Sequence, residues 1–216
     1  MSVDKEIARE AVRRGAVQKV PELERLVALV REHQPRTVVE IGTDTGGTLF
    51  AWSRAAHPEA LLVSIDLPGG LFGGGYSRRD ARRFRQFARE GQKIHTLRRD
   101  SHDPKTVRRL ERLLAGRSID FLLIDGDHSY EGVKRDWELY EPFVPPGGLI
   151  AFHDILRHEE QSERITPCEV ERFWEELPPE HRTVEFTDPT DDRGYGRWGG
   201  IGVIFKEAEG AQARST

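Results

Sequence analysis

The segment Phe121-Leu-Leu-Ile-Asp125-Gly-Asp127-His128-Ser129-Tyr-Glu131 joins a short apolar run to a dense group of polar residues. Four consecutive apolar residues ahead of a turn-forming glycine are typical of a buried parallel strand. Two carboxylates and an imidazole then follow within four residues. In open α/β sheets ligands bind in the crevice outside the carboxyl ends of the strands. The segment therefore predicts both a central strand and a functional site at its end.

Apolar runs alternate with helical patterns on both sides of this segment. Four more strands are expected in this alternation, at 37–41, 61–65, 93–97 and 149–152. Repeated βα units form a parallel sheet with right-handed crossovers. Two last strands, near 183–186 and 201–205, are joined without a helix and must be antiparallel to each other. We predict an α/β fold, a Rossmann-like, seven-stranded, mostly parallel sheet with an antiparallel final strand and helices on both faces.

The chain is expected to form one sheet domain preceded by a helical extension. Its 216 residues contain no linker rich in Ser, Gly and Pro. Residues 1–34 predict two extra N-terminal helices without a position in the sheet. We expect these helices to cap the site or to form contacts in a homo-oligomer. Residues 35–207 should form the sheet domain and residues 208–216 a disordered tail.

Composition and charge exclude several classes of protein. The single cysteine, Cys168, rules out an internal disulfide and a cysteine-built metal cluster, and we interpret it as a buried bystander at a helix start. No apolar run approaches membrane-spanning length and no signal peptide is evident, so we expect a cytoplasmic protein without a membrane partner. A net charge of −4 does not favour nucleic acid, and we interpret the arginine-rich segment 78–89 as a solvated basic helix.

A glycine-rich turn follows the first predicted strand, with the sequence Glu40-Ile41-Gly42-Thr43-Asp44-Thr45-Gly46-Gly47. Such a turn lets the backbone approach a ligand and directs amide groups at it, although a plain turn between strand and helix has the same appearance. The glycine spacing differs from that of dinucleotide fingerprints and phosphate loops. NAD and ATP are therefore not favoured as ligands.

Acidic residues at the ends of the next two predicted strands indicate the kind of ligand. Asp66 lies about 20 residues beyond the turn and is placed to accept both hydroxyls of a ribose. Asp100-Ser101 follows the third strand, where it would meet an adenine edge or form only an Asx turn. A nucleoside-containing ligand without a pyrophosphate fits these residues best.

Taken together, the motifs resemble class I S-adenosylmethionine-dependent methyltransferases, in particular the branch with the cephalosporin-hydroxylase-like proteins and the metal-dependent sugar O-methyltransferases of macrolide pathways. The resemblance covers roughly residues 35–205, and its motifs lie at 38–47, 65–66, 121–131, 133–136 and 146–154. It implies S-adenosylmethionine as the cofactor. The cofactor-binding residues implied are Glu40, Gly42, Thr43, Gly46, Asp66, Asp100, Ser101 and Asp125.

The ends of the fourth and fifth predicted strands carry residues suited to methyl transfer. Neighbouring parallel strands lie about 4.8 Å apart, so Asp125 and Asp154 can converge on a hard cation such as Mg²⁺. The cation would lower the pKa of an acceptor hydroxyl, and His128 could take its proton before attack on the sulfonium methyl. In the similar sugar methyltransferases the Asp125 position is a metal ligand, the His128 position is the proposed base, and the pair after the fifth strand supplies further ligands.

This chain departs from those relatives at His153-Asp154, where they carry two adjacent acidic residues. The cation site is then weaker, or it prefers a transition metal, or His153 is not a ligand. A metal-free site with His128 or His153 as the base stays open. So does a structural role, in which Asp127 or Ser129 caps the following helix.

The sequence thus predicts a methyltransferase that acts on a small-molecule hydroxyl, of a sugar or natural product. Asp125 and His128 are the candidate catalytic residues, and the candidate metal ligands are Asp125, His153 and Asp154. One alternative is methylation of RNA or another macromolecule, which a continuous exposed basic patch over 78–117 would favour. The other is a non-catalytic, cofactor-binding partner subunit.

Overall fold

A computed structural model describes residues 2–71, 74–156, 168–177, 181–190 and 198–207. Helices and strands alternate through most of this part of the chain. They are α1 (Val3–Arg13), α2 (Val20–His33), β1 (Thr37–Ile41), α3 (Gly47–Ala55), β2 (Leu61–Asp66), α4 (Arg78–Phe84), β3 (Lys93–Arg98), α5 (Pro104–Leu114), β4 (Phe121–Ile124), α6 (Tyr130–Tyr140), β5 (Leu149–His153), α7 (Val170–Glu175), β6 (Arg182–Phe186) and β7 (Ile201–Phe205).

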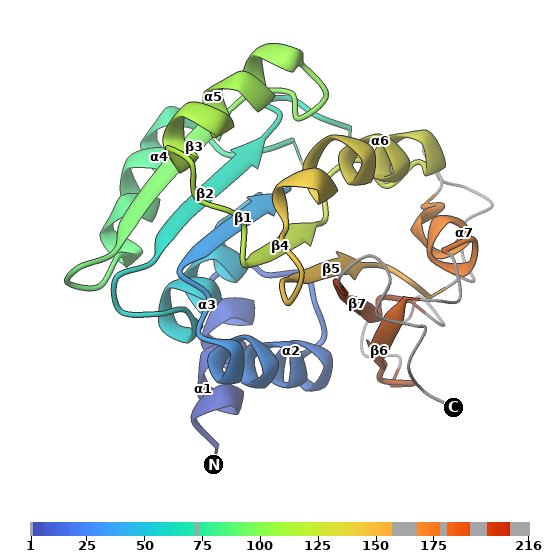
Figure 1. The fold of residues 1–216 in the computed structure, drawn as a ribbon. Helices are drawn as coiled ribbons and strands as arrows, with labels where there is room; N and C mark the ends of the chain where they lie inside the picture. Colours follow the sequence, from blue (N-terminus) through green and yellow to red (C-terminus); the bar gives the residue numbers. More distant parts are fainter. Residues whose placement is uncertain (1, 72–73, 157–167, 178–180, 191–197, 208–216) are drawn as a thin grey trace.

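The strands form one sheet in the order β3-β2-β1-β4-β5-β7-β6 (Figure 1). Strands β1 to β5 are parallel to one another, whereas β7 runs antiparallel to both β5 and β6. This arrangement confirms the predicted seven-stranded, mostly parallel fold with an antiparallel final hairpin. The carboxyl ends of β1, β2, β4 and β5 consequently lie along one edge of the sheet, where the sequence places its polar residues.

Helices cover both faces of the sheet, and each face has its own core. Helices α1 to α4 pack on one face and α5 to α7 on the other. Neighbouring side chains of a strand point to opposite faces, so Val38 of β1 enters the first core and Val39 the second. Burial on both faces explains why the central strands are mostly apolar.

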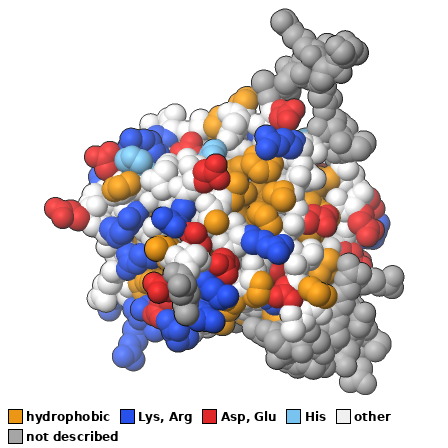
Figure 2. Space-filling model, turned by 90° about the horizontal axis from the view of Figure 1, so that it is seen from below, with side chains coloured by type: hydrophobic (Ala, Val, Ile, Leu, Met, Phe, Trp, Pro, Cys, Tyr) orange, Lys and Arg blue, Asp and Glu red, His pale blue; other side chains and the backbone are white. Residues whose placement is uncertain are grey.

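Helices α1 and α2 belong to the main core. Side chains of both helices, Ala8, Ala11, Leu23, Leu26 and Val27, are at most 1% exposed. Helix α1 contacts α3, and α2 contacts α3, β6 and β7. The two helices therefore help to cover one sheet face, a position that the sequence analysis did not assign to them. The predicted contact between subunits through these helices stays a prediction; Figure 2, which views the molecule from their side, shows apolar side chains among the charged ones on this face.

Side-chain caps begin several of the predicted helices. Ser77 and Asp80 form a capping box on α4, Asp103 caps α5, and Ser129 caps α6 by accepting from the amide of Gly132 at 3.1 Å. Helix α7 begins at Val170, two residues after Cys168, which the sequence analysis placed at a helix start. Residues 157–167 and the predicted tail at 208–216 lie outside the described residues.

The arginine-rich helix α4 has one buried and one exposed face. Ala81 and Phe84 are buried, whereas Arg78, Arg79 and Arg82 are exposed. This amphipathic pattern agrees with a solvated basic helix.

Among the described helices, none combines the length and the apolar character needed to cross a membrane.

Candidate active site

Four titratable side chains converge where β4 and β5 end. His153 Nδ1 lies 3.2 Å from Asp125 Oδ1 and 3.5 Å from Asp154 Oδ1. His128 spans the same two carboxylates, with Nε2 3.3 Å from Asp125 Oδ1 and Nδ1 3.2 Å from Asp154 Oδ2. The structure thus brings together all four residues that the sequence nominated for catalysis and metal binding.

The register of the sheet explains why these residues meet. Strands β4 and β5 are parallel neighbours with Ile124 opposite Phe152, so Asp125 and His153 leave the sheet side by side. Asp154 then adopts a left-handed backbone conformation with φ of 62°. Few non-glycine residues adopt this conformation, and it persists only where the surroundings stabilise it. This turn directs the Asp154 carboxylate back toward His128 and His153.

Gln18 is a further member of the group, and the sequence analysis missed it. Its Nε2 donates to Asp125 Oδ2 at 2.7 Å, and its side chain is brought there by the connection between α1 and α2. Gln18 is 5% exposed, and its Oε1 has no hydrogen-bond partner within the described residues. A buried polar residue between two helical patterns is a weak sequence signal, since its partner lies 107 residues away.

Charge within the group is balanced by the histidines. Burial alone would raise the pKa of Asp125, but the charge of His153 and the hydrogen bond from His128 bring that pKa below its ordinary value. Burial would likewise lower the pKa of His128 and His153, but contacts with Asp125 and Asp154 hold both imidazole pKa values well above ordinary. Without a cation, the two carboxylates and the two imidazoles thus stabilise each other's charged forms.

The donor set fits a divalent cation. One ligand atom each from Asp125, His153 and Asp154 lies within 4.8 Å of the others. Ligands around an octahedral Mg²⁺ are roughly 3 Å apart, close to the 3.2 Å between His153 Nδ1 and Asp125 Oδ1. Two carboxylates with one imidazole suit a hard or borderline ion. A cation there would balance the charge of the two carboxylates in place of the imidazoles.

The glycine turn lies directly beside this group. A Cβ on Gly42, which has φ of +82°, would sit 1.9 Å from the carbonyl oxygen of Asp125, so only glycine fits. Asp66 at the end of β2 accepts hydrogen bonds from the amides of Thr43 and Asp44 at 2.9 and 2.6 Å. The turn, Asp66 and the four residues Asp125, His128, His153 and Asp154, which we call the Asp125 group, therefore lie along one edge of the sheet.

Glu40 is fully buried beneath the turn. Its carboxylate accepts from Trp52 Nε1 at 2.8 Å and from the Thr43 hydroxyl at 2.7 Å. Burial raises the pKa of Glu40 to about 7, despite hydrogen bonds from Thr48, Thr43 and Trp52 that lower it. In this conformation Glu40 holds the turn from below, and its predicted contact with a cofactor stays a prediction.

Glu40 should make stability depend on pH with a definite sign. Because the folded pKa of about 7 exceeds the ordinary value of 4.5, this group's contribution to stability is present below about pH 4.5 and is lost as pH rises through 7. We expect Glu40→Gln to remove this loss. Between about pH 5 and pH 8, the unfolding free energy of wild type should therefore fall by up to about 3 kcal/mol relative to that of the variant. Denaturant unfolding at both pH values measures the difference. The exposed Glu90→Gln is the control, and parallel pH profiles of Glu40→Gln and wild type would contradict the expectation.

The corner after β3 combines a turn with a second histidine and carboxylate pair. Asp100 accepts from the amide of His102 at 2.8 Å, which is an Asx turn, and His102 Nε2 lies 3.2 Å from Oδ1 of the buried Asp136. An open hollow of about 410 Å³ adjoins this corner and is lined in part by His102, Asp127 and Ser129. The adenine contact predicted for Asp100-Ser101 stays a prediction.

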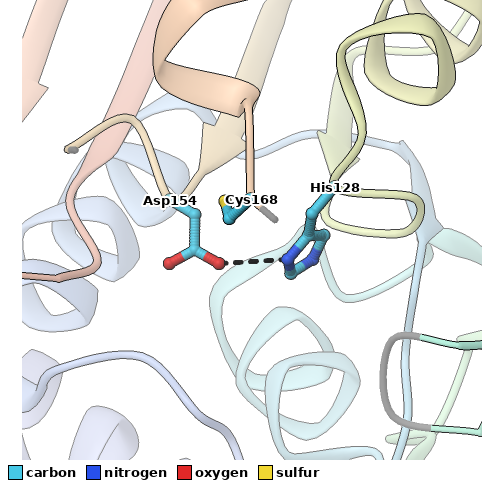
Figure 3. A group of neighbouring side chains, drawn as sticks. All are labelled: His128, Asp154 and Cys168. Carbon is cyan, nitrogen blue, oxygen red and sulfur yellow. Dashed lines mark ion pairs between the residues drawn. The ribbon is translucent and has the colours of Figure 1, made fainter. Parts of the chain in front are cut away.

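Cys168 also lies at this edge of the sheet. Figure 3 shows Asp154 and His128 facing each other, with Cys168 above and between them. The thiol is 3% exposed and lies within 4.8 Å of ligand atoms of both residues. The predicted burial of Cys168 is confirmed, whereas its position beside His128 had no signal in the sequence.

A family model described as a methyltransferase domain matches residues 39–155. This range runs from β1 to just beyond β5. It contains the glycine turn, Asp66 and the four residues of the Asp125 group, but not Gln18. The match and the fold confirm the resemblance to class I methyltransferases, but they do not specify the cephalosporin-hydroxylase-like branch.

Two curated proteins match part of the chain. An uncharacterized protein of Acanthamoeba polyphaga mimivirus is 34% identical over 123 residues, which are 57% of this chain and 53% of that protein. An uncharacterized protein of Sinorhizobium fredii is 26% identical over 134 residues, which are 58% of this chain and 14% of that protein. The matched part thus spans about half the length of the first relative and a smaller part of the second.

Solved structures resemble nearly the whole chain. An O-methyltransferase from Bacillus cereus in complex with SAH has a TM-score of 0.64 at 18% identity, with 95% of this chain and 92% of that chain covered. The O-methyltransferase TomG from Streptomyces achromogenes, involved in tomaymycin synthesis and in complex with SAM, has a TM-score of 0.65 at 18% identity, with 96% and 91% covered. At this level of identity the likeness establishes the shared fold.

Proposed function

The chain belongs to the family of methyltransferase domains. We propose that it transfers the methyl group of S-adenosylmethionine to a hydroxyl of a sugar or small natural product, with the help of a divalent cation such as Mg²⁺. The observation that carries the proposal is the convergence of Asp125, His128, His153 and Asp154 beside the glycine turn. The similar solved structures, O-methyltransferases in complex with SAM or SAH, support the choice of cofactor and of oxygen as the acceptor.

The cofactor would lie across the ends of β1, β2 and β4. The turn from Gly42 to Gly46 would present its backbone to the methionine part of the cofactor. Asp66, which already binds the turn amides, would accept the ribose hydroxyls. This position would direct the sulfonium methyl toward the Asp125 group, where the acceptor binds.

Methyl transfer needs an acceptor oxygen that loses its proton. The oxygen attacks the methyl carbon, the bond between that carbon and the sulfonium sulfur breaks, and S-adenosylhomocysteine leaves. His128, in its neutral form, would take the hydroxyl proton. A divalent cation held by Asp125, His153 and Asp154 would lower the pKa of the hydroxyl. Gln18 would keep Asp125 in position through its hydrogen bond of 2.7 Å.

Methyl transfer from labelled S-adenosylmethionine to a panel of sugars and natural-product alcohols tests the proposal. We expect product only from hydroxyl acceptors, dependence on added Mg²⁺, and loss of turnover on chelation. Full activity after exhaustive chelation would exclude the cation, and tight cofactor binding without transfer to any hydroxyl would exclude the reaction. Methyl transfer to RNA as fast as to small hydroxyl acceptors, together with strongly salt-dependent binding of the RNA, would favour the macromolecular alternative.

Asp66→Ala should weaken the binding of S-adenosylhomocysteine roughly 10- to 100-fold, because hydrogen bonds to a charged group contribute about 1.5–3 kcal/mol. Titration calorimetry measures the affinity. Asp66→Asn is the matched control, since its amide oxygen can still accept from Thr43 and hold the turn. Unchanged affinity in Asp66→Ala would remove the ribose role from this residue.

A further inference from the structure

We propose that Cys168, His128 and Asp154 form a binding site for a thiophilic divalent cation, with zinc as the expected ion. The three side chains come from separate parts of the chain and meet at one point (Figure 3). His128 follows β4, Asp154 follows β5 and Cys168 precedes α7. The site differs from the one proposed for Mg²⁺ in two of its three ligands, and it includes the only cysteine of the chain.

The spacing of the donor atoms agrees with zinc coordination. Ligands of a tetrahedral zinc ion lie roughly 3.2–3.7 Å apart. His128 Nδ1 and Asp154 Oδ2 are 3.2 Å apart, and donor atoms of all three residues lie within 4.8 Å of one another. Small side-chain movements are therefore enough to close the three ligands around an ion. A fourth position would remain for water.

Backbone contacts hold the three ligands in place. The amide of Glu169, the residue after Cys168, donates to the carbonyl oxygen of His128 at 2.7 Å. The Glu169 carboxylate in turn accepts from the amide of Tyr130 at 3.3 Å. These bonds tie the start of α7 to the β4–α6 connection, so Cys168 stays next to His128. The left-handed turn at Asp154 supplies the third ligand from β5.

His128 also has the outer partner that metal-binding histidines require. Zinc-bound imidazoles almost always donate their second ring nitrogen to a carboxylate, a carbonyl or a water. With Nδ1 directed at Asp154, His128 Nε2 lies 3.3 Å from Asp125 Oδ1. Asp125 would therefore orient His128 as a ligand without touching the ion.

The thiol decides which ions the site selects. Sulfur ligands favour zinc and other thiophilic ions over Mg²⁺, which takes oxygen ligands. Binding requires the thiolate form of Cys168 and the neutral form of His128, so it releases protons to solvent and the affinity should rise with pH. This consequence rests on the proposed function: an ion on His128 would remove the base, and zinc should inhibit the methyl transfer that Mg²⁺ supports.

Cobalt is the probe that tests the site, because a bond between Co²⁺ and a thiolate gives a charge-transfer absorption band in the near ultraviolet. Since Cys168 is the only cysteine, the band can report only this site. We expect one equivalent of Co²⁺ to produce the band in the full chain and one equivalent of Zn²⁺ to abolish it. Cys168→Ser, which keeps size and burial, should lack the band, and His128→Ala should lose it or bind much more weakly.

His95→Ala is the matched control, because His95 is exposed on β3 and should keep the band. Asp125→Asn should keep the band with an affinity lowered roughly 10- to 100-fold, as expected for an outer partner. Absence of the band from the wild type would overturn the proposal, and so would equal Co²⁺ affinity of wild type and Cys168→Ser. The spectrum needs no substrate or cofactor, so its outcome is independent of whether the chain transfers methyl groups.

Discussion

Asp125→Asn and Asp154→Asn should each reduce Mg²⁺-dependent methyl transfer to the background rate. Each change replaces a carboxylate that contacts both His128 and His153 with an amide of the same shape. The amide is a poor ligand for a hard cation, and it cannot balance the charge of two imidazoles. Initial rates at saturating cofactor, together with calorimetric titration of Mg²⁺, measure the two losses separately.

Asp127→Asn is the matched control for these variants. Asp127 lies two residues after Asp125, but its Oδ1 accepts from the amide and hydroxyl of Ser129 at the start of α6. We expect this variant to keep its Mg²⁺ affinity and most of its turnover. Circular dichroism establishes that each variant is folded. Wild-type Mg²⁺ dependence in a folded Asp125→Asn protein would contradict the proposed cation site.

The sequence predicted the sheet and the position of the Asp125 group for the same physical reason. Parallel strands buried on both faces are continuous apolar runs, and the residues that follow them must emerge at one edge. Adjacency of β4 and β5 then brings Asp125 within reach of His153 and Asp154. The local sequence pattern and the geometry of a parallel sheet are therefore enough to predict these contacts.

Gln18 and Cys168 could not be predicted in this way. Their places depend on how the α1–α2 connection and the start of α7 pack against the sheet edge, which no local periodicity encodes. Glu40 shows the opposite case: its position in the turn motif was clear, but only the packing of Trp52 and Thr43 reveals a buried carboxyl with a raised pKa. A sequence pattern therefore predicts which residues lie near a site better than it predicts which hydrogen-bond partners their side chains have.

His128→Ala should lower turnover roughly 10²- to 10⁴-fold, the usual contribution of a general base, while the affinity for S-adenosylhomocysteine stays unchanged. His128 contacts Asp125 and Asp154 beyond the ends of β4 and β5, whereas the predicted ribose contact lies at Asp66 on β2. Single-turnover rates and calorimetry measure the two quantities. The exposed His95→Ala serves as the histidine control.

Two further readouts distinguish a base from a purely structural histidine. Burial would lower the pKa of His128, but the hydrogen bonds with Asp125 and Cys168 and the charge of Asp154 raise it well above its ordinary value. Only the neutral imidazole accepts a proton, so wild-type turnover at saturating Mg²⁺ should rise with pH as His128 loses its proton, and His128→Ala should lose this rise. Added imidazole should partly restore the variant, because it can enter the space left by the side chain. If the variant keeps the wild-type rate and pH profile, His128 is not the base, and the neighbouring His153 becomes the residue to test.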